Sequence, residues 1–208
     1  SLLFMCLAFI SCMTEKKISE QSAIKGVAHD YLTIDEAISA LKVHEAAAPL
    51  AADPGVSPKL PASFSPPYRS IKPIKLFDNL YFVGTTTVGS LIVDSGDGLV
   101  MLDTGIGDAD IVMMVKDMKK LGLDPSRIKL IFISHEHFDH YGGVQYLKKN
   151  VCPDAKVAMS LVGWNLLQTV PSEWAYIGTR PQSIDIYLLD GMKIKIGNEI
   201  FQIVATPG

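Results

Sequence analysis

The chain has 208 residues, of which 48% are hydrophobic and 20% are charged, and its formal net charge is −3. This composition is typical of a globular domain with a sizeable core. The weak negative charge and the scattered lysines offer no basic surface, so we expect no nucleic-acid partner. Of the three cysteines, Cys6 and Cys12 lie near the start and Cys152 stands alone in the body, which excludes an internal disulfide framework.

The first residues form an apolar run from Leu2 to Ile10. It has the length of the hydrophobic part of a signal peptide and is too short to span a bilayer as a helix. Residues 1–14 are therefore predicted to be an export signal, which places the protein in the periplasm or on the bacterial membrane. Ser11 before Cys12 resembles a lipoprotein processing site and favours a lipid anchor on Cys12. Ordinary cleavage between Ser11 and Thr14, or a buried strand in place of a signal, are the alternatives.

Residues 15–73 are predicted to contain one helix and a proline-rich arm or linker. Thr33 and Glu36 have the spacing of a capping box, and apolar residues recur after them at helical spacing. Seven prolines follow within this segment and prevent regular structure. His29 and His44 flank the helix as isolated histidines, so we expect neither to bind a metal.

The compact domain is predicted to span residues 74–208. Strand-like runs separated by short turns come first, and apolar residues at helical spacing follow. In chain order we expect a hairpin over 75–84, strands at 90–94 and 99–103, a helix over 108–121, a strand at 129–134, a helix over 142–149, a strand at 156–159, a helix over 161–169 and a hairpin over 184–204. The mixture of strands and covering helices predicts an α/β fold.

Three histidines and a carboxylate lie within six residues directly after the apolar strand 129–134. Side chains two apart on an extended segment point the same way, so His135 and His137 can bind one ion while Glu136 and Phe138 turn away. Asp139 and His140 follow in a turn and can reach a neighbouring second ion. Imidazole and carboxylate together favour Zn²⁺, with iron or manganese as alternatives.

Three segments resemble motifs of one family. Ser134 to Gly143 reads Ser-His-x-His-x-Asp-His-x-Gly-Gly and resembles the H-x-H-x-D-H signature of the metallo-β-lactamase superfamily. Asp103-Thr104-Gly105 resembles the Asp-Thr-Gly of the family, whose aspartate lies close to the metal ligands and supports them. Thr206-Pro207-Gly208 resembles the start of the family's Thr-Pro-Gly-His, and the chain stops one residue before the histidine that completes the first metal site.

The resemblance implies the αββα sandwich of the family, with the metals at one edge between two sheets and only about the N-terminal half to two-thirds of the fold present. It also implies two zinc ions, one held by His135 and His137 and the other by Asp139 and His140, with further ligands after Gly208. A water between the two ions would lose a proton and attack a carbonyl. Asp139 would orient this hydroxide and take up its proton, and Asp103 would fix the tautomer of a ligand imidazole.

The implied activity is hydrolysis of a small molecule, and the family includes β-lactamases, thioesterases, lactonases and nucleases. Export favours a β-lactam, and a ligand set without cysteine is similar to one β-lactamase subclass. We therefore expect a class B β-lactamase that confers antibiotic resistance. An exported lactonase or thioesterase, or a metal-binding protein without hydrolytic activity, are the alternatives. A related di-iron oxidoreductase is disfavoured, because that branch has glutamate where this chain has His137.

Overall fold

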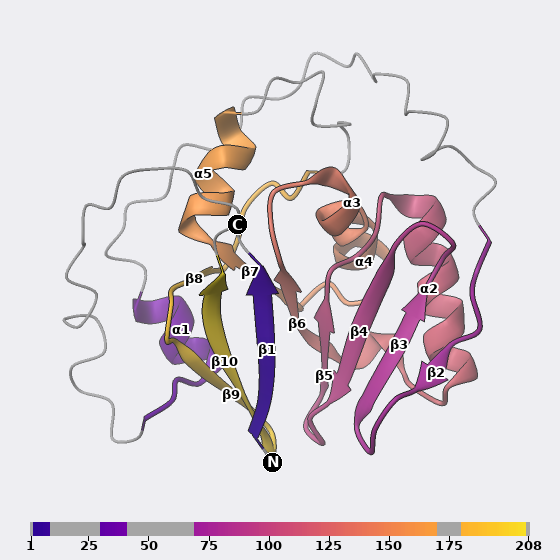
Figure 1. Ribbon diagram of the computed structural model, residues 1–208, viewed down its shortest axis with the longest axis horizontal. Coiled ribbons are helices and arrows are strands. Elements are labelled where there is room, and N and C mark those ends of the chain that lie inside the picture. Colours follow the sequence, from indigo (N-terminus) through magenta and orange to yellow (C-terminus); the bar gives the residue numbers. More distant parts are fainter. Residues whose placement is uncertain (1, 9–29, 41–68, 170–179, 207–208) are drawn as a thin grey trace.

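A computed structural model of the chain describes residues 2–8, 30–40, 69–169 and 180–206. Two sheets form the framework, one of seven strands in the order β2-β3-β4-β5-β6-β7-β8 and one of three strands in the order β1-β10-β9. Figure 1 shows the smaller sheet in front of one end of the larger sheet. Helices α2 and α4 lie behind the larger sheet. The α/β fold predicted from the sequence is confirmed.

The larger sheet combines an antiparallel half with a parallel half. Its antiparallel strands are β2 (Ile74–Lys75), β3 (Leu80–Gly84), β4 (Gly89–Asp94) and β5 (Leu99–Leu102). Its parallel strands, which continue from β5, are β6 (Ile128–Ile133), β7 (Lys156–Ser160) and β8 (Ile186–Leu188). Because β5, β6 and β7 are parallel, their carboxyl ends meet at one edge of the sheet.

The helices and the smaller sheet cover the two faces of the larger sheet. The helices are α1 (Ile34–Ala40), α2 (Asp108–Lys120), α3 (Phe138–Tyr141), α4 (Val144–Asn150) and α5 (Leu161–Thr169), with a 3₁₀ turn at Pro125–Arg127. The smaller sheet contains β1 (Leu2–Ala8), β9 (Lys193–Ile196) and β10 (Glu199–Thr206).

Strand β6 is buried on both of its faces. Ile131 and Ile133 pack into the core formed with α2, α4 and α5. Leu130 and Phe132 point the other way, into the core formed with α1, β9 and β10. This double burial explains why the strand reads as a continuous apolar run. It also fixes the strand's register, so the residues that follow Ile133 leave the sheet at a defined place.

Most predicted elements are present, and three predictions need correction. The capping box is confirmed, because Thr33 N donates to Glu36 Oε2 at 2.8 Å and Glu36 N donates to Thr33 Oγ1 at 3.2 Å. The helix expected from 142 begins at Val144, and the turn expected at 139–140 is the short helix α3. The hairpin expected over 184–204 is made by β9 and β10 alone, because β8 joins the larger sheet beside β7.

The apolar run at the start of the chain forms strand β1, which pairs in parallel with β10. The export signal, the lipid anchor and the alternative of a buried strand all stay predictions. Cys12, the proline-rich arm, His29 and His44 lie outside the described residues. None of the helices in the described residues is long and apolar enough to cross a membrane.

Cys152 is expected to be unreactive in the native protein. It is a free thiol with 2% of its surface exposed, and burial raises its pKa to about 11 although the charge of Lys148 opposes this. Only the thiolate reacts, so Ellman's reagent at pH 8 should modify Cys152 only after unfolding in guanidinium. The test uses a variant with Cys6→Ser and Cys12→Ser. Rapid labelling without denaturant would show that the thiol is accessible.

Candidate metal centre

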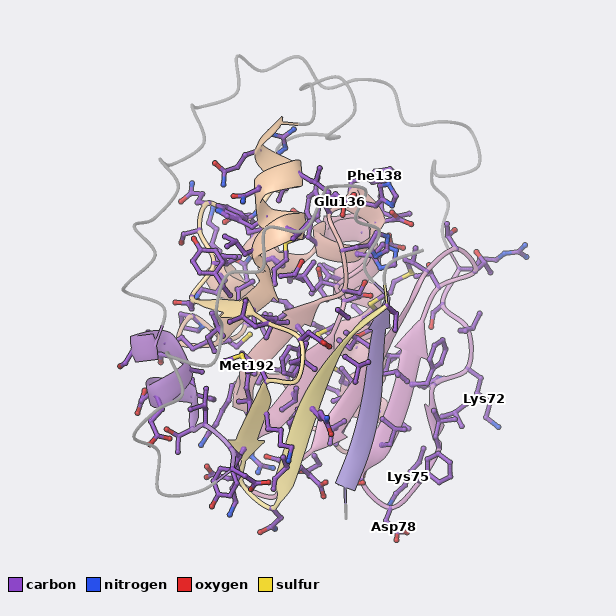
Figure 2. The ribbon with its side chains drawn as sticks, turned by 60° about the vertical axis from the view of Figure 1, so that its left-hand side comes forward. Lys72, Lys75, Asp78, Glu136, Phe138 and Met192 are labelled. Carbon is purple, nitrogen blue, oxygen red and sulfur yellow. The ribbon has the colours of Figure 1, made fainter. Side chains whose placement is uncertain are left out.

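The four predicted ligands lie at the carboxyl end of β6, between the ends of its parallel neighbours β5 and β7. After Ile133 the chain bends through Ser134 to His137, and α3 begins at Phe138. In Figure 2, Glu136 and Phe138 mark this end of the molecule, and Lys75 and Asp78 lie at the opposite end. The placement agrees with the edge at which α/β sheets bind ligands.

The imidazoles of the motif are gathered closely. The ring centroids of His135 and His137 are 4.8 Å apart, and those of His135 and His140 are 3.8 Å apart. His140 Nε2 lies 3.6 Å from Asp139 Oδ2. Within the described residues, however, no group of three His, Cys, Asp or Glu side chains is placed to hold one ion. The described residues therefore bring these four side chains close together without forming a complete three-ligand site.

Asp103 lies against His140, as the Asp-Thr-Gly motif predicts. It directly follows β5 and has a left-handed φ of 59°. Its Oδ1 accepts from Ser134 N at 2.8 Å, and its Oδ2 lies 2.8 Å from His140 Nδ1. With Nδ1 held by this carboxylate, His140 keeps Nε2 for a metal.

Two hydroxyl residues at this site were not predicted. Ser134 Oγ lies within hydrogen-bond distance of Asp103, His135 and His140. Thr104 donates to His140 O from its N at 2.7 Å and from its Oγ1 at 3.1 Å, and that Oγ1 accepts from Gly143 N at 3.1 Å. The available signal was their position, since each adjoins a predicted site residue at a strand end.

The charges at the site act on the two histidines in opposite directions. Burial lowers the pKa of His135, and the neighbouring His140 and His137 lower it further. Burial also works to lower the pKa of His140, but the hydrogen bond and charge of Asp103, with the charges of Asp139 and Glu136, raise it overall. Only an unprotonated imidazole binds a metal, so protons compete for His140 more strongly than for His135.

Glu136 follows His135 in the segment that bends after β6. Its charge acts on both His135 and His140, and its Oε2 is buried without a hydrogen-bond partner. That its side chain turns away from the metal ligands stays a prediction, and the strand alternation behind that prediction ends at Ile133, where the backbone bends. Glu136 therefore adds negative charge that acts on the predicted ligands His135 and His140.

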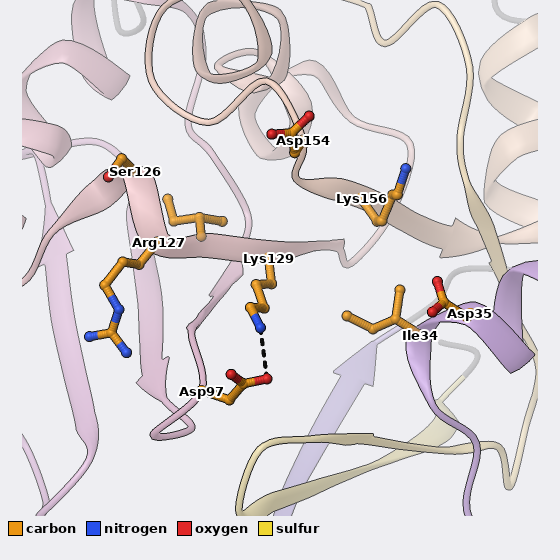
Figure 3. A pocket seen from close by; sticks show the side chains of 9 residues that line it. Ile34, Asp35, Asp97, Ser126, Arg127, Lys129, Asp154 and Lys156 are labelled. Atoms are coloured by element: carbon orange, nitrogen blue, oxygen red, sulfur yellow. Dashed lines mark hydrogen bonds and ion pairs between the residues drawn. The ribbon is translucent and has the colours of Figure 1, made fainter.

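A pocket of about 410 Å³ lies at the other end of β6. Figure 3 shows its lining of mixed charge, in which Lys129 Nζ pairs with Asp97 Oδ2 at 2.7 Å and Arg127 and Asp154 stand nearby. Ile128 and Lys129, which line this pocket, are the first residues of β6, whereas the histidines follow its last residue. The pocket is therefore separate from the candidate metal centre.

Residues 84–208, more than half of the chain, match the sequence model of the metallo-beta-lactamase superfamily. The chain belongs to the metallo-β-lactamase superfamily. All three segments that resemble the family motifs lie in the matched range, so the prediction of the family is confirmed.

Solved structures of the superfamily have a similar fold. The metallo-β-lactamase MIM-1 from Novosphingobium pentaromativorans is 30% identical with a TM-score of 0.54, over 62% of this chain and 48% of that one. GOB-18 from Elizabethkingia meningoseptica is 26% identical with a TM-score of 0.59, over 71% and 55%. FEZ-1 from Legionella gormanii, at 24% identity with a TM-score of 0.57 over 65% and 53%, is similar in fold. The chain spans about half the length of these relatives.

Proposed function

We propose that this chain is part of a zinc-dependent hydrolase that opens β-lactam rings. The observation that carries the proposal is the gathering of His135, His137, Asp139 and His140 at the carboxyl end of β6. Membership of the superfamily supports a metal-dependent hydrolase, and the similarity to MIM-1 and GOB-18, both named as metallo-β-lactamases, supports the substrate.

The donor atoms at the site fit zinc. The Nδ1 atoms of His135 and His140 lie 2.9 and 3.1 Å from Ser134 Oγ, so Nε2 of each ring is left for a metal. Imidazole nitrogen and carboxylate oxygen are ordinary zinc ligands. We assign His135 and His137 to one ion and Asp139 and His140 to the other. A zinc ion, when bound, polarises a carbonyl and brings the pKa of a coordinated water near neutrality.

Asp139 supplies the proton transfer that the reaction needs. Ring opening forms a carbon–oxygen bond at the β-lactam carbonyl, breaks the amide carbon–nitrogen bond and adds a proton to the nitrogen. Asp139 Oδ2 lies 3.6 Å from His140 Nε2, and in this proposal the carboxylate accepts the proton of the attacking water and passes it to the leaving nitrogen. Asp103 keeps the ring of His140 oriented during this transfer.

The test is hydrolysis of a chromogenic cephalosporin by the full-length, zinc-loaded protein, beside a lactone and a thioester, with and without a chelator. We expect the cephalosporin to be turned over fastest and the chelator to abolish turnover. Faster turnover of the lactone or the thioester would support the proposed hydrolase activity but contradict the proposed β-lactam substrate. Two bound zinc ions without any turnover would favour the non-hydrolytic alternative.

We also propose that the protein acts outside the inner membrane and is anchored to the membrane by a lipid on Cys12. A β-lactam meets a bacterial enzyme in that compartment before it reaches its targets. Radiolabelled palmitate should be incorporated into the protein in cells, and Cys12→Ala should abolish the labelling. Export of an unlabelled protein cleaved between Ser11 and Thr14 would support ordinary signal cleavage instead.

A further inference from the structure

We propose that the Ser134 hydroxyl is a positioning group that sets the tautomer and orientation of one histidine in each predicted metal pair. The inference deepens the proposed metal site and rests on it for its functional consequence. Ser134 directly follows β6 and is 9% exposed. Its Oγ lies 2.8 Å from Asp103 Oδ2, 2.9 Å from His135 Nδ1 and 3.1 Å from His140 Nδ1.

The position of Ser134 is fixed from two sides. Its backbone N donates to Asp103 Oδ1 at 2.8 Å, and its hydroxyl donates to Asp103 Oδ2 at the same distance. Both oxygens of one buried carboxylate therefore hold one residue. With two such bonds, the hydroxyl cannot rotate away without losing a charge-assisted hydrogen bond in a buried place.

Counting protons determines the tautomers. An ionised carboxylate accepts hydrogen bonds only, and a serine hydroxyl has one proton to donate. Because that proton goes to Asp103, Ser134 Oγ can only accept from His135, whose Nδ1 must then carry a hydrogen. His140 Nδ1 must likewise donate to Asp103 Oδ2, 2.8 Å away. In the neutral form, both rings therefore have an unprotonated Nε2, the form that binds a metal.

The hydroxyl connects the two predicted pairs. His135 belongs to the pair with His137, and His140 belongs to the pair with Asp139. Ser134 contacts one ring of each and joins both to Asp103. Loss of the hydroxyl should therefore affect the orientation of the His135 ring more than that of the His140 ring, because the direct hydrogen bond between His140 and Asp103 remains.

The test compares Ser134→Ala and Ser134→Thr with Ser160→Ala in the full-length protein. Ser160 is a matched control, because it ends the neighbouring strand β7, is 8% exposed and accepts from Gly163 N at 2.9 Å. Removing a group that orients a metal ligand typically weakens metal binding about 10- to 100-fold. We expect this loss for Ser134→Ala, recovery in Ser134→Thr, and zinc affinity close to wild type in Ser160→Ala.

A readout without metal separates this inference from the proposed function. Imidazole ¹⁵N NMR of the zinc-free protein reports which ring nitrogen carries the proton. Ser134→Ala should shift the His135 tautomer away from Nδ1–H, and Ser134→Thr should restore it. An unchanged His135 tautomer would overturn the inference, whatever zinc does. Wild-type protein with the expected tautomers but without zinc binding would overturn the proposed function alone.

Discussion

Replacing Asp139 with asparagine is expected to lower kcat/KM for the best substrate by about 10²- to 10⁴-fold, the usual contribution of a positioned general base. The asparagine side chain has the same shape but no charge, so it neither holds a cation well nor accepts the proton of the attacking water. Asp139 Oδ2 lies 3.6 Å from His140 Nε2, and its side chain is 23% exposed. A change of charge at this place should affect chemistry far more than folding.

The measurement is steady-state kinetics together with zinc content after gel filtration. Asp97→Asn is the matched control, since it makes the same chemical change at the far end of β6. Asp97 is 66% exposed and pairs with Lys129, and an exposed ion pair of this kind contributes little. Full activity of Asp139→Asn with two zinc ions bound would rule out the role assigned to this carboxylate.

The sequence predicts well those features that depend on neighbours along the chain. The capping box of Thr33 and Glu36 needs only three residues of spacing, and the structure contains both of its hydrogen bonds. The apolar run of β6 is equally local, since burial on both faces demands such a run wherever the strand lies. The motif that follows β6 therefore has a predictable place in the fold.

The remaining features depend on contacts between distant segments. Ser134 meets Asp103 across 31 positions of sequence, and this contact exists because β5 and β6 end side by side. The position of Ser134 beside His135 places it near the site, but neither residue type nor local spacing predicts its contact with Asp103. The partner of β8 depends on a distant contact in the same way. The sequence pattern of Ile186 to Leu188 allows pairing with either β9 or β7, and in the structure β8 pairs with β7. The bend after Ile133 sets a further limit, because strand alternation does not place the side chains that follow it.

Replacing Gly142 with alanine is expected to be the most damaging single-methyl change in the described part of the domain. A Cβ at this position would lie 1.9 Å from Ile106 O and 2.1 Å from Ile106 C. Both atoms are backbone, so no side chain can move aside. The loop cannot retreat easily either, because Gly142 N donates to Gly105 O at 2.8 Å and Ile106 N donates to Asp110 Oδ2 at 3.1 Å.

Such overpacking should cost about 3 kcal/mol of folding free energy. For a domain of this size, that corresponds to a fall in Tm of roughly 6 to 12 °C. Gly163→Ala, in the first turn of α5, is the control, because its Cβ would lie 3.0 Å from the ends of two side chains, Met159 Cε and Ser160 Oγ, and from no backbone atom this closely. Thermal unfolding of both variants, followed by circular dichroism without zinc, makes the comparison. Equal Tm values would mean that the loop can move aside, whereas a large fall in Gly142→Ala alone would show that the close approach of residue 142 to the Ile106 backbone requires glycine.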